Sequence, residues 1–461
     1  MKKFDVIIIG AGPAGIITGT TAKTAYPEKS ILMFKEEEKG LVPCGIPYVF
    51  HALNGVEQNM MGPKPFIDMG GEVITDKVVD VDVKNSTLKT ESGQEFAFEK
   101  LVFATGSKVM VPTFIPGYDL ENVFYIKKSF NYIKNLFEVL QTKKDIVVIG
   151  GGFIGAEVAE QLALHPDKRI TLVESEEYCF SKAFSRDLSI IATKALSETK
   201  VKVITSTRVE ELKDSNGIAT SVMLNTGETI ACDAVIMAIG YRPNTELAQK
   251  AGLELNKRGA IKVDNYERTE FQNICAVGDC SQTTGFLTGR SDTVMLASTA
   301  TAEARVLGHN LFGVKIRKTF NGTIAVFSTE INGLAMAAAG VNESNAKAAN
   351  IKIVSAQFSD FDTHPAVFKN TSALTLKLFA SPCDGSILGG EVWGGRTAGE
   401  IINTISLAIQ KGVSVFELIS YQIGSHPLLT AAPTKTLLIK AAEKIIEIIE
   451  SNKACDKTKN A

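Results

Sequence analysis

The chain has 461 residues, of which 45% are hydrophobic and 22% charged, and its formal net charge is −2. This length allows roughly three domains. The balanced charge excludes an extended nucleic-acid-binding surface, and no apolar run approaches the roughly 18 residues of a membrane span. Seven scattered cysteines form neither a disulfide framework nor a metal site, so we expect a reducing cytoplasm and no bound metal.

An internal repeat is the most informative feature. Residues 4–15 and 145–155 each contain an apolar strand, the pattern G-x-G-x-x-G and the start of a helical pattern. Such glycines allow a tight turn close to a pyrophosphate, and the helix N-terminus supplies N–H donors. We expect nucleotide contacts at Gly10, Gly12, Pro13, Ala14 and Gly15 in the first copy, and at Gly150, Gly152, Phe153, Ile154, Gly155 and Glu157 in the second.

A second strand follows each loop, at 30–34 and 170–173, and an acid stands near its end. Glu36 and Glu174 are therefore the candidate ligands of a ribose diol. A carboxylate at Glu174 accepts from a ribose 2′-hydroxyl and repels a 2′-phosphate, so we predict that NADH is preferred over NADPH.

Each copy closes with an apolar strand that ends in glycine, at 101–106 and 234–240. Such strands are typical of parallel sheets buried on both faces. Between these elements, residues 72–99 and 201–231 alternate apolar and polar side chains, which predicts antiparallel meanders. The sequence thus predicts two βαβ modules. Further candidate nucleotide contacts are Val78, Ala104, Thr105, Gly106 and Gly240.

From about residue 320 the pattern changes to an α+β arrangement. We predict strands at 322–329, 351–358, 372–380 and 385–393, and helices at 397–410, 414–420 and 434–450, followed by a frayed polar tail.

Residues 40–50 contain the candidate redox centre. Cys44 stands just before a predicted helix start, with Pro47 in the first turn. A thiol at a helix N-terminus has its thiolate stabilised and its pKa lowered. We therefore predict that Cys44 is reactive, whereas the other six cysteines are buried and inert.

Two motifs resemble a known family. The strand that ends in Gly278-Asp279 resembles the second FAD-binding motif of two-dinucleotide flavoproteins, in which the Asp binds the ribityl and phosphate region. Cys44-Gly45-Ile46-Pro47-Tyr48 is similar to the C-G-L-P-Y of FAD-dependent pyridine nucleotide-disulfide oxidoreductases with one redox cysteine. The two-cysteine branch has C-x4-C, but Lys39 and Val49 stand five residues to either side of Cys44.

The resemblance implies an α/β fold with two Rossmann-like domains, for FAD and NAD, and a C-terminal α+β dimerisation domain. The implied domains are 1–113 with 246–318 for FAD, 114–245 for NAD(P)H, 319–451 for dimerisation and a flexible tail at 452–461.

Ser425-His426-Pro427 resembles the His-Pro of lipoamide and glutathione reductases, in which the partner subunit supplies the His as acid and base. The Glu that orients it there is replaced by Ala431, and the loop His of the peroxidases and oxidases is replaced by Pro13.

The resemblance therefore implies a homodimeric enzyme that uses FAD and NADH, with Cys44 and His426 as its catalytic residues. The leading acceptor is a small disulfide or sulfur compound: coenzyme A disulfide, a polysulfide or a persulfide. The alternatives are an oxidase or peroxidase that reduces O2 or H2O2, a reductase of a carrier protein, and a redox-sensing flavoprotein.

Overall fold

The first repeated segment builds a mixed sheet around β1 (Lys2–Ile9) in the computed structural model, which describes residues 1–292, 294–317 and 319–459. β1 runs parallel to β2 (Ile31–Lys35) on one side and to β8 (Glu95–Phe103) on the other. The order is β5-β2-β1-β8-β7-β6, with β19 also beside β8. The remaining strands are β5 (Glu72–Thr75), β6 (Val78–Asp82), β7 (Thr87–Thr90) and β19 (Ile274–Ala276).

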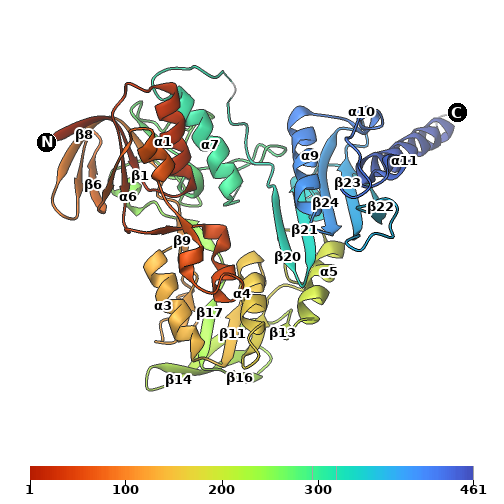
Figure 1. The fold of residues 1–461 in the computed structure, drawn as a ribbon, viewed down its shortest axis with the longest axis horizontal. Coiled ribbons are helices and arrows are strands. Elements are labelled where there is room, and N and C mark those ends of the chain that lie inside the picture. Colours follow the sequence, from red (N-terminus) through yellow and green to blue (C-terminus); the bar gives the residue numbers. More distant parts are fainter. Residues whose placement is uncertain (293, 318, 460–461) are drawn as a thin grey trace.

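Both faces of this sheet are buried. Val6 and Ile8 face α1 (Pro13–Ala25) and α7 (Ala297–Asn310), which pack side by side in Figure 1. Ile7 and Ile9 point to the opposite face, because side chains alternate along a strand, and pack near the short α6 (Glu246–Lys250). The nearly continuous apolar run of β1 follows from burial on both sides.

The second repeated segment builds a parallel sheet in the order β10-β17-β11-β12-β13. Its helices are α3 (Phe130–Gln141), α4 (Phe153–Ala163) and α5 (Arg186–Ser197). The two predicted βαβ modules are thereby confirmed. The strands are β10 (Val123–Tyr125), β11 (Asp145–Ile149), β12 (Arg169–Val173), β13 (Val201–Ile204) and β17 (Ala234–Met237).

The two predicted meanders are correct only in part. β5 pairs in parallel with β2, and β13 pairs in parallel with β12, so the first strand of each segment extends the main sheet. The antiparallel pairs are β6 with β7 and β7 with β8 in the first module. In the second they join β14 (Val209–Ser215), β15 (Ile218–Leu224) and β16 (Thr229–Ala231).

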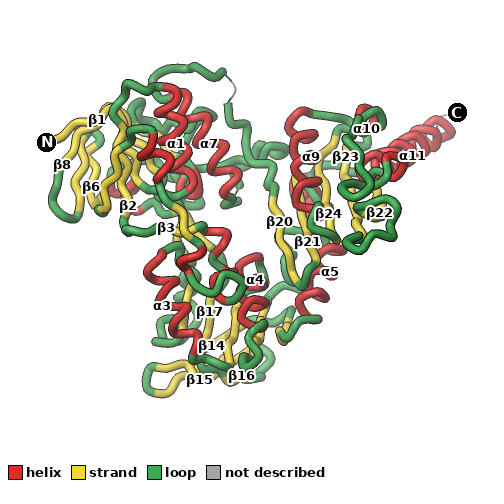
Figure 2. The backbone as a smooth tube through the Cα atoms, in the orientation of Figure 1, coloured by secondary structure: helices red, strands yellow, loops and turns green. Residues whose placement is uncertain are grey.

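Two short ribbons border the site. β9 (Ser107–Val109) pairs with β18 (Tyr241–Pro243), where the chain crosses between the modules. β3 (Gly40–Leu41) pairs with β4 (Met60–Met61) and frames the segment that carries Cys44. β9 in Figure 1 and β3 in Figure 2 lie close to the junction of the modules.

The C-terminal unit is an antiparallel sheet in the order β20-β21-β24-β23-β22. Its strands are β20 (Phe327–Ile331), β21 (Leu334–Gly340), β22 (Val354–Phe361), β23 (Ala373–Ala380) and β24 (Ile387–Gly394). Its helices are α8 (Glu343–Ala349), α9 (Ala398–Lys411), α10 (Val415–Leu418) and α11 (Leu437–Lys459).

Four features of this unit differ from the expectation. β21 and α8 were not predicted, and the predicted strand at 322–329 begins later, at Phe327. α11 continues past residue 450 to Lys459, through most of the predicted tail, and residues 460–461 lie outside the described part of the chain.

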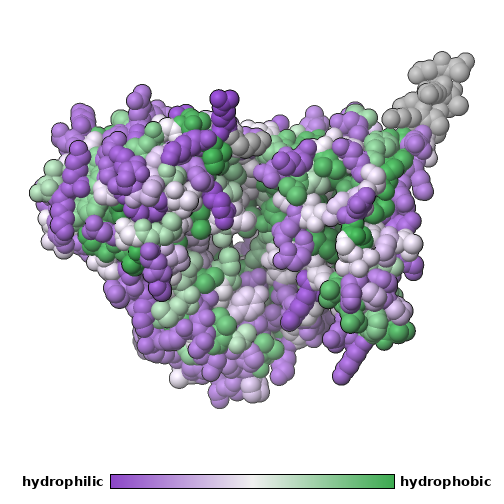
Figure 3. All heavy atoms as spheres, turned by 45° about the horizontal axis from the view of Figure 1, so that its top comes forward, coloured by the Kyte–Doolittle hydropathy of each residue, from purple (hydrophilic) through white to green (hydrophobic). Residues whose placement is uncertain are grey.

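The C-terminal unit packs against the second module through aromatic rings. Phe153 of α4 contacts Phe327 of β20, and the rings of Phe180 and Phe184 complete the cluster. The units surround a hollow on the face shown in Figure 3. Across the described residues, no helix combines the length and the apolar character needed to cross a membrane.

Candidate active site

The first glycine loop leaves an open cradle at the start of α1. Gly10 has φ +114°, and a Cβ there would overlap the carbonyl oxygen of Ala104. A Cβ on Gly12 would meet nothing within 4 Å. No side chain caps α1, and its first turn contains no acid. The N–H groups at this helix end therefore face space that suits the pyrophosphate of a dinucleotide.

The second loop has the same construction. Gly150 has φ +109° and closely approaches the carbonyl of Ala238, whereas Gly152 again faces open space. α4 likewise starts without a side-chain cap or an acid in its first turn. The sequence repeat is therefore a repeat of two phosphate-binding geometries.

The acid beside the second loop is held in place. The Glu174 carboxylate accepts hydrogen bonds from Gly151 N–H at 2.5 Å and from Glu176 N–H at 2.7 Å. These bonds turn the carboxylate toward the loop, as a ribose ligand requires.

When the two repeated segments are compared, the residue of the first that is equivalent to Glu174 is Lys35 rather than Glu36. Gly10 N–H donates to the Phe34 carbonyl at 3.0 Å, and Gly150 N–H donates to the Val173 carbonyl at 2.8 Å. Lys35 and Glu174 are the next residues of these two strands. Lys35 Nζ donates to the Glu38 carbonyl at 2.6 Å. Glu36 is exposed one residue further on, and its role as a ribose ligand stays a prediction.

A cleft of about 990 Å³, here called the central cleft, joins these features. It runs from the acidic segment after β2, across the first loop, to the Cys44 segment and to the start of α4. Its volume and the open loop fit FAD. The expected residues that line it are Gly10, Gly12, Pro13, Ala14, Glu36, Cys44, Val78, Ala104, Thr105, Gly106, Phe153, Ile154, Glu157 and Asp279.

The remaining expected residues lie around this lining. Gly15 packs against the backbone of Gly10 behind the first loop, and Gly278 lies beside Ala14. The residues that belong to the second loop and its strand ends are Gly150, Gly152, Gly155, Glu174 and Gly240.

Cys44 is exposed in the wall of the central cleft, but the predicted helix after it is absent. The chain forms short 3-10 turns at Pro43–Gly45 and Pro47–Phe50 instead. The expected effect of a helix dipole is therefore wrong. The thiol is open to the cleft, but the protein atoms around it displace water, and this partial desolvation raises the pKa of Cys44 above its usual value, with Lys128 acting in the opposite direction.

Five of the other six cysteines can be compared with the prediction, and Cys383 is the exception; the side chain of Cys455 lies outside the described part of the chain. Cys179, Cys232, Cys275 and Cys280 are buried, whereas Cys383 is exposed. It follows the end of β23 at a turn, so the prediction of burial was wrong there.

Glu157 adds a buried carboxyl to the same cleft. It accepts a hydrogen bond from Thr329 Oγ1 at 2.7 Å. Burial raises its pKa to about 7, with a smaller contribution from Glu160. The phenol of Tyr48 lies near these groups, and burial and Glu157 raise its pKa. The cleft thus presents an acid that can hold or release a proton near neutral pH.

Sequence reasoning missed Lys128, which lines the central cleft just before α3. Its Nζ donates to Asp279 Oδ2 at 2.8 Å and to Ser107 Oγ at 2.7 Å, and it lies 4.8 Å from the centre of the Tyr241 ring. Lys128 stands in a polar segment far from every motif, so no local pattern marks it.

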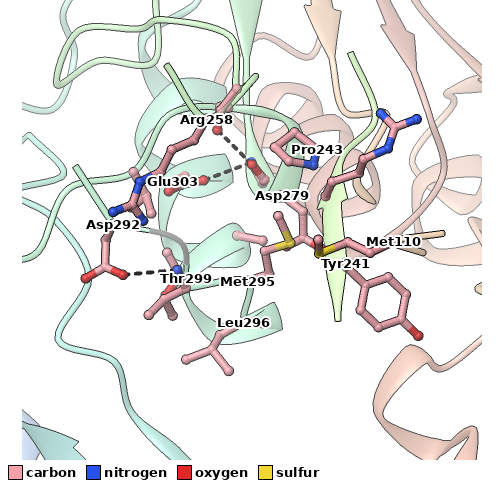
Figure 4. Close-up of a pocket in the computed structure, with 17 residues that line it drawn as sticks. Met110, Tyr241, Pro243, Arg258, Asp279, Asp292, Met295, Leu296, Thr299 and Glu303 are labelled. Carbon is pink, nitrogen blue, oxygen red and sulfur yellow. Dashed lines mark hydrogen bonds between the residues drawn. The ribbon is translucent and has the colours of Figure 1, made fainter. Parts of the chain in front are cut away.

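A smaller cavity of about 220 Å³ lies behind Asp279 (Figure 4). Glu303 of α7 is buried at its wall, and its Oε2 accepts from Gly278 N–H at 2.8 Å. Burial raises the pKa of Glu303 to about 8. Glu303 therefore fixes the turn that presents Asp279 to the central cleft.

His426 lies on an exposed loop after α10. Its Nδ1 accepts from Leu428 N–H at 3.3 Å, which leaves the proton of the neutral ring on Nε2. His364 holds this loop: its backbone N–H donates to the Pro427 carbonyl, and its Nδ1 donates to the Thr430 carbonyl, both at 2.9 Å.

The structure does not bring His426 to Cys44 within one chain. Of the residues that the structure describes, none beyond Ser328 lines the central cleft.

Comparisons with known proteins identify the family to which this chain belongs. Residues 4–304 match the family model described as pyridine nucleotide-disulphide oxidoreductase, and residues 325–437 match the dimerisation domain of the same family. A NADH oxidase of Methanocaldococcus jannaschii is 30% identical over 432 residues, which are 91% of this chain and 94% of the relative.

Two further relatives have sulfur chemistry in their names. A CoA-dependent NAD(P)H sulfur oxidoreductase of Pyrococcus abyssi is 30% identical over 81% of this chain and 84% of its own length. The structure of a NAD-dependent persulfide reductase from A. fulgidus superimposes with a TM-score of 0.88 at 28% identity, and the match covers 97% of this chain and 84% of that one. Since the matches span both nucleotide modules and the C-terminal unit, the chain belongs to the pyridine nucleotide-disulphide oxidoreductase family and is an enzyme that uses FAD and NAD(H).

Proposed function

We propose that this enzyme oxidises NADH and reduces a small disulfide or other sulfur acceptor through Cys44. The acceptor class is coenzyme A disulfide, a polysulfide or a persulfide. The observation that carries the proposal is the exposed Cys44 thiol in the wall of the cleft that also contains the first phosphate loop and Asp279. The sulfur reductases among the relatives support this acceptor class.

The residues of the central cleft would hold FAD. The N-terminus of α1 would bind the pyrophosphate, and Asp279 would bind the ribityl region. The loop at 150–155 and Glu174 would bind NADH. When bound, FAD supplies the transfer of the two electrons that arrive as hydride from NADH and that reduce the oxidised sulfur on Cys44.

Cys44 performs the exchange with the acceptor. Its thiolate attacks one sulfur of the acceptor, so that a Cys44–sulfur bond forms and the S–S bond of the acceptor breaks. The other sulfur leaves as a thiolate and takes a proton. With the two electrons of NADH, the overall change is NADH, one proton and a disulfide converted to NAD+ and two thiols.

His426 of the partner subunit is the proposed proton donor. The dimerisation domain supports a homodimer, and the exposed loop leaves the Nε2–H of His426 open to a second chain. The hydrogen bond from Leu428 N–H to Nδ1 orients the ring, whereas a Glu orients the His in the reductases that the loop resembles. Action in trans would account for the separation of His426 from Cys44 in one chain.

An anaerobic titration with NADH tests the role of Cys44. The oxidised holoenzyme is expected to take up two reducing equivalents beyond the two of the flavin and to develop a long-wavelength thiolate-to-flavin charge-transfer band. Cys44→Ser should lose the extra uptake, the band and turnover with the sulfur acceptor. Cys383→Ser is the matched control, because it removes the other exposed thiol of the described residues. Full turnover of Cys44→Ser would refute the proposal.

The NADH oxidase among the relatives favours O2 as a second candidate acceptor. Steady-state consumption of NADH with coenzyme A disulfide, polysulfide, O2 and H2O2 separates the two. A kcat/KM for O2 or H2O2 above that for every sulfur acceptor would replace the sulfur assignment. Slow turnover with all of them would redirect the search to a carrier protein or to a sensing role.

A further inference from the structure

Without Lys128, the charged groups that act most strongly on the Cys44 thiol would all be negative. Glu157 and Asp279 both disfavour a negative charge on the thiol, and burial acts in the same direction. The Tyr48 hydroxyl faces the same region, and its pKa is raised by the negative charges of Glu157, Glu160, Glu330 and Cys44. Lys128 lines the same cleft as Cys44, and its positive charge favours the thiolate.

The contacts of Lys128 fix where its charge lies. The ammonium is bonded to Asp279 and Ser107 and lies over the Tyr241 ring. It therefore connects the start of α3 in the second module to the turn after β19 in the first. Its side chain has 27% of its surface exposed, so water screens it only in part.

Three of the four other lysines that line the cleft are held differently. Lys35 bonds to the Glu38 carbonyl, Lys39 lies 5.2 Å from the centre of the Phe130 ring, and Lys108 pairs with Glu246. None of these three is among the main charges that act on the Cys44 thiol.

We propose that the Lys128 ammonium is the positioning cation that stabilises the Cys44 thiolate in the holoenzyme. This inference rests on the proposed role of Cys44 as the attacking thiol. Lys128 offsets the negative charge of Asp279, to which it is bonded, so that the thiolate can form without a helix dipole. It acts through Cys44 and transfers no proton itself. Loss of Lys128 would also leave Asp279 without its ion-pair partner and increase the repulsion at Cys44.

The test measures the titration of Cys44 in Lys128→Met, Lys128→Gln and Lys128→Arg. The holoenzyme is reduced with two equivalents beyond the resting state, and the charge-transfer absorbance is recorded against pH. In parallel, the rate of Cys44 alkylation by iodoacetamide is followed by peptide mass spectrometry, with Cys383 as the internal reference. Lys127→Met is the matched control, since Lys127 lies 4.5 Å from the Tyr132 ring instead.

We expect the Met and Gln variants to titrate at least about one pH unit higher and to be alkylated about tenfold more slowly at pH 7, because the thiolate fraction falls tenfold for each unit. The Arg variant and Lys127→Met should remain close to wild type. Flavin content, measured on each protein, separates this effect from loss of FAD through Asp279.

An unchanged Cys44 titration in both neutral variants would overturn the inference, and so would an equal shift in Lys127→Met. Failure of the proposed function has a different signature: Cys44 of the wild type would show no charge-transfer band and no selective alkylation, or Cys44→Ser would keep full turnover. In that case Lys128 has no thiolate to stabilise, and both proposals fail.

Discussion

Glu391 makes the stability of this protein depend on pH near neutrality. This carboxyl of β24 is 1% exposed and accepts hydrogen bonds from the N–H and the Oγ–H of Ser185, both at 2.5 Å. Ser185 caps α5, so the contact joins the C-terminal sheet to the second module. Burial raises the pKa of Glu391 to about 7, and Glu343 adds to this rise, whereas Ser185 and Lys377 oppose it.

The sign follows from proton linkage. The folded protein keeps the Glu391 proton up to about pH 7, whereas the unfolded chain loses it near 4.5. The free energy of unfolding therefore falls as pH rises through this window, and is lowest above it. At about 1.4 kcal/mol for each pH unit, the loss amounts to about 3 kcal/mol.

Glu391→Gln removes this titration and keeps an acceptor for Ser185. The assay is the melting temperature of the variant minus that of the wild type, at pH 5 and at pH 8.5. This difference in melting temperature should be a few degrees larger at pH 8.5 than at pH 5, because the wild type loses stability at the higher pH and the variant does not. The raised pKa values of Glu157 and Glu303 affect both proteins equally and cancel. The same difference at both pH values, as expected for the exposed control Glu210→Gln, would refute the reasoning.

Three further predictions concern the nucleotide sites. Glu174→Ala should lower the NADH/NADPH ratio of kcat/KM by at least about tenfold, since it removes the ribose ligand and the repulsion of a 2′-phosphate; an unchanged ratio contradicts this. Lys35→Glu should lower the Kd of FAD about tenfold in fluorescence titrations, because it places an acid at the position that matches Glu174; a higher Kd would contradict this expectation. Gly155→Ala should lower the melting temperature of the apoprotein strongly because its Cβ would overlap the Gly150 carbonyl, whereas Gly152→Ala should weaken NADH binding at an unchanged melting temperature.

The sequence was most informative where backbone geometry requires particular residues. Gly10 and Gly150 have φ values that L side chains rarely adopt, and both closely approach a neighbouring strand. Such positions leave a mark that can be read without a structure. The apolar strands buried on both faces leave a similar mark, so the two βαβ modules could be predicted.

Local patterns failed where tertiary context decides. β21 has the sequence Leu-Ala-Met-Ala-Ala-Ala-Gly, and alanine is a poor strand former. It is a strand because it pairs with β20 on one side and with β24 on the other. Glu36 shows a smaller limit: an acid near a strand end can be recognised from the sequence, but only hydrogen bonds across the sheet show that it stands one residue beyond the position that matches Glu174.

The proposed reactivity of Cys44 shows what one short motif leaves undetermined. The motif places a thiol beside a nucleotide loop, but its own backbone forms 3-10 turns that provide no helix dipole. The compensating charge comes from Lys128, and the opposing charges come from Glu157 and Asp279, all far from Cys44 in the chain. These three groups meet only because the first module, the second module and the ribbon of β9 and β18 together line one cleft. The chemistry of the thiol is thus a property of the junction between the modules, which is why substitution of a lysine outside every motif is the sharpest test of it.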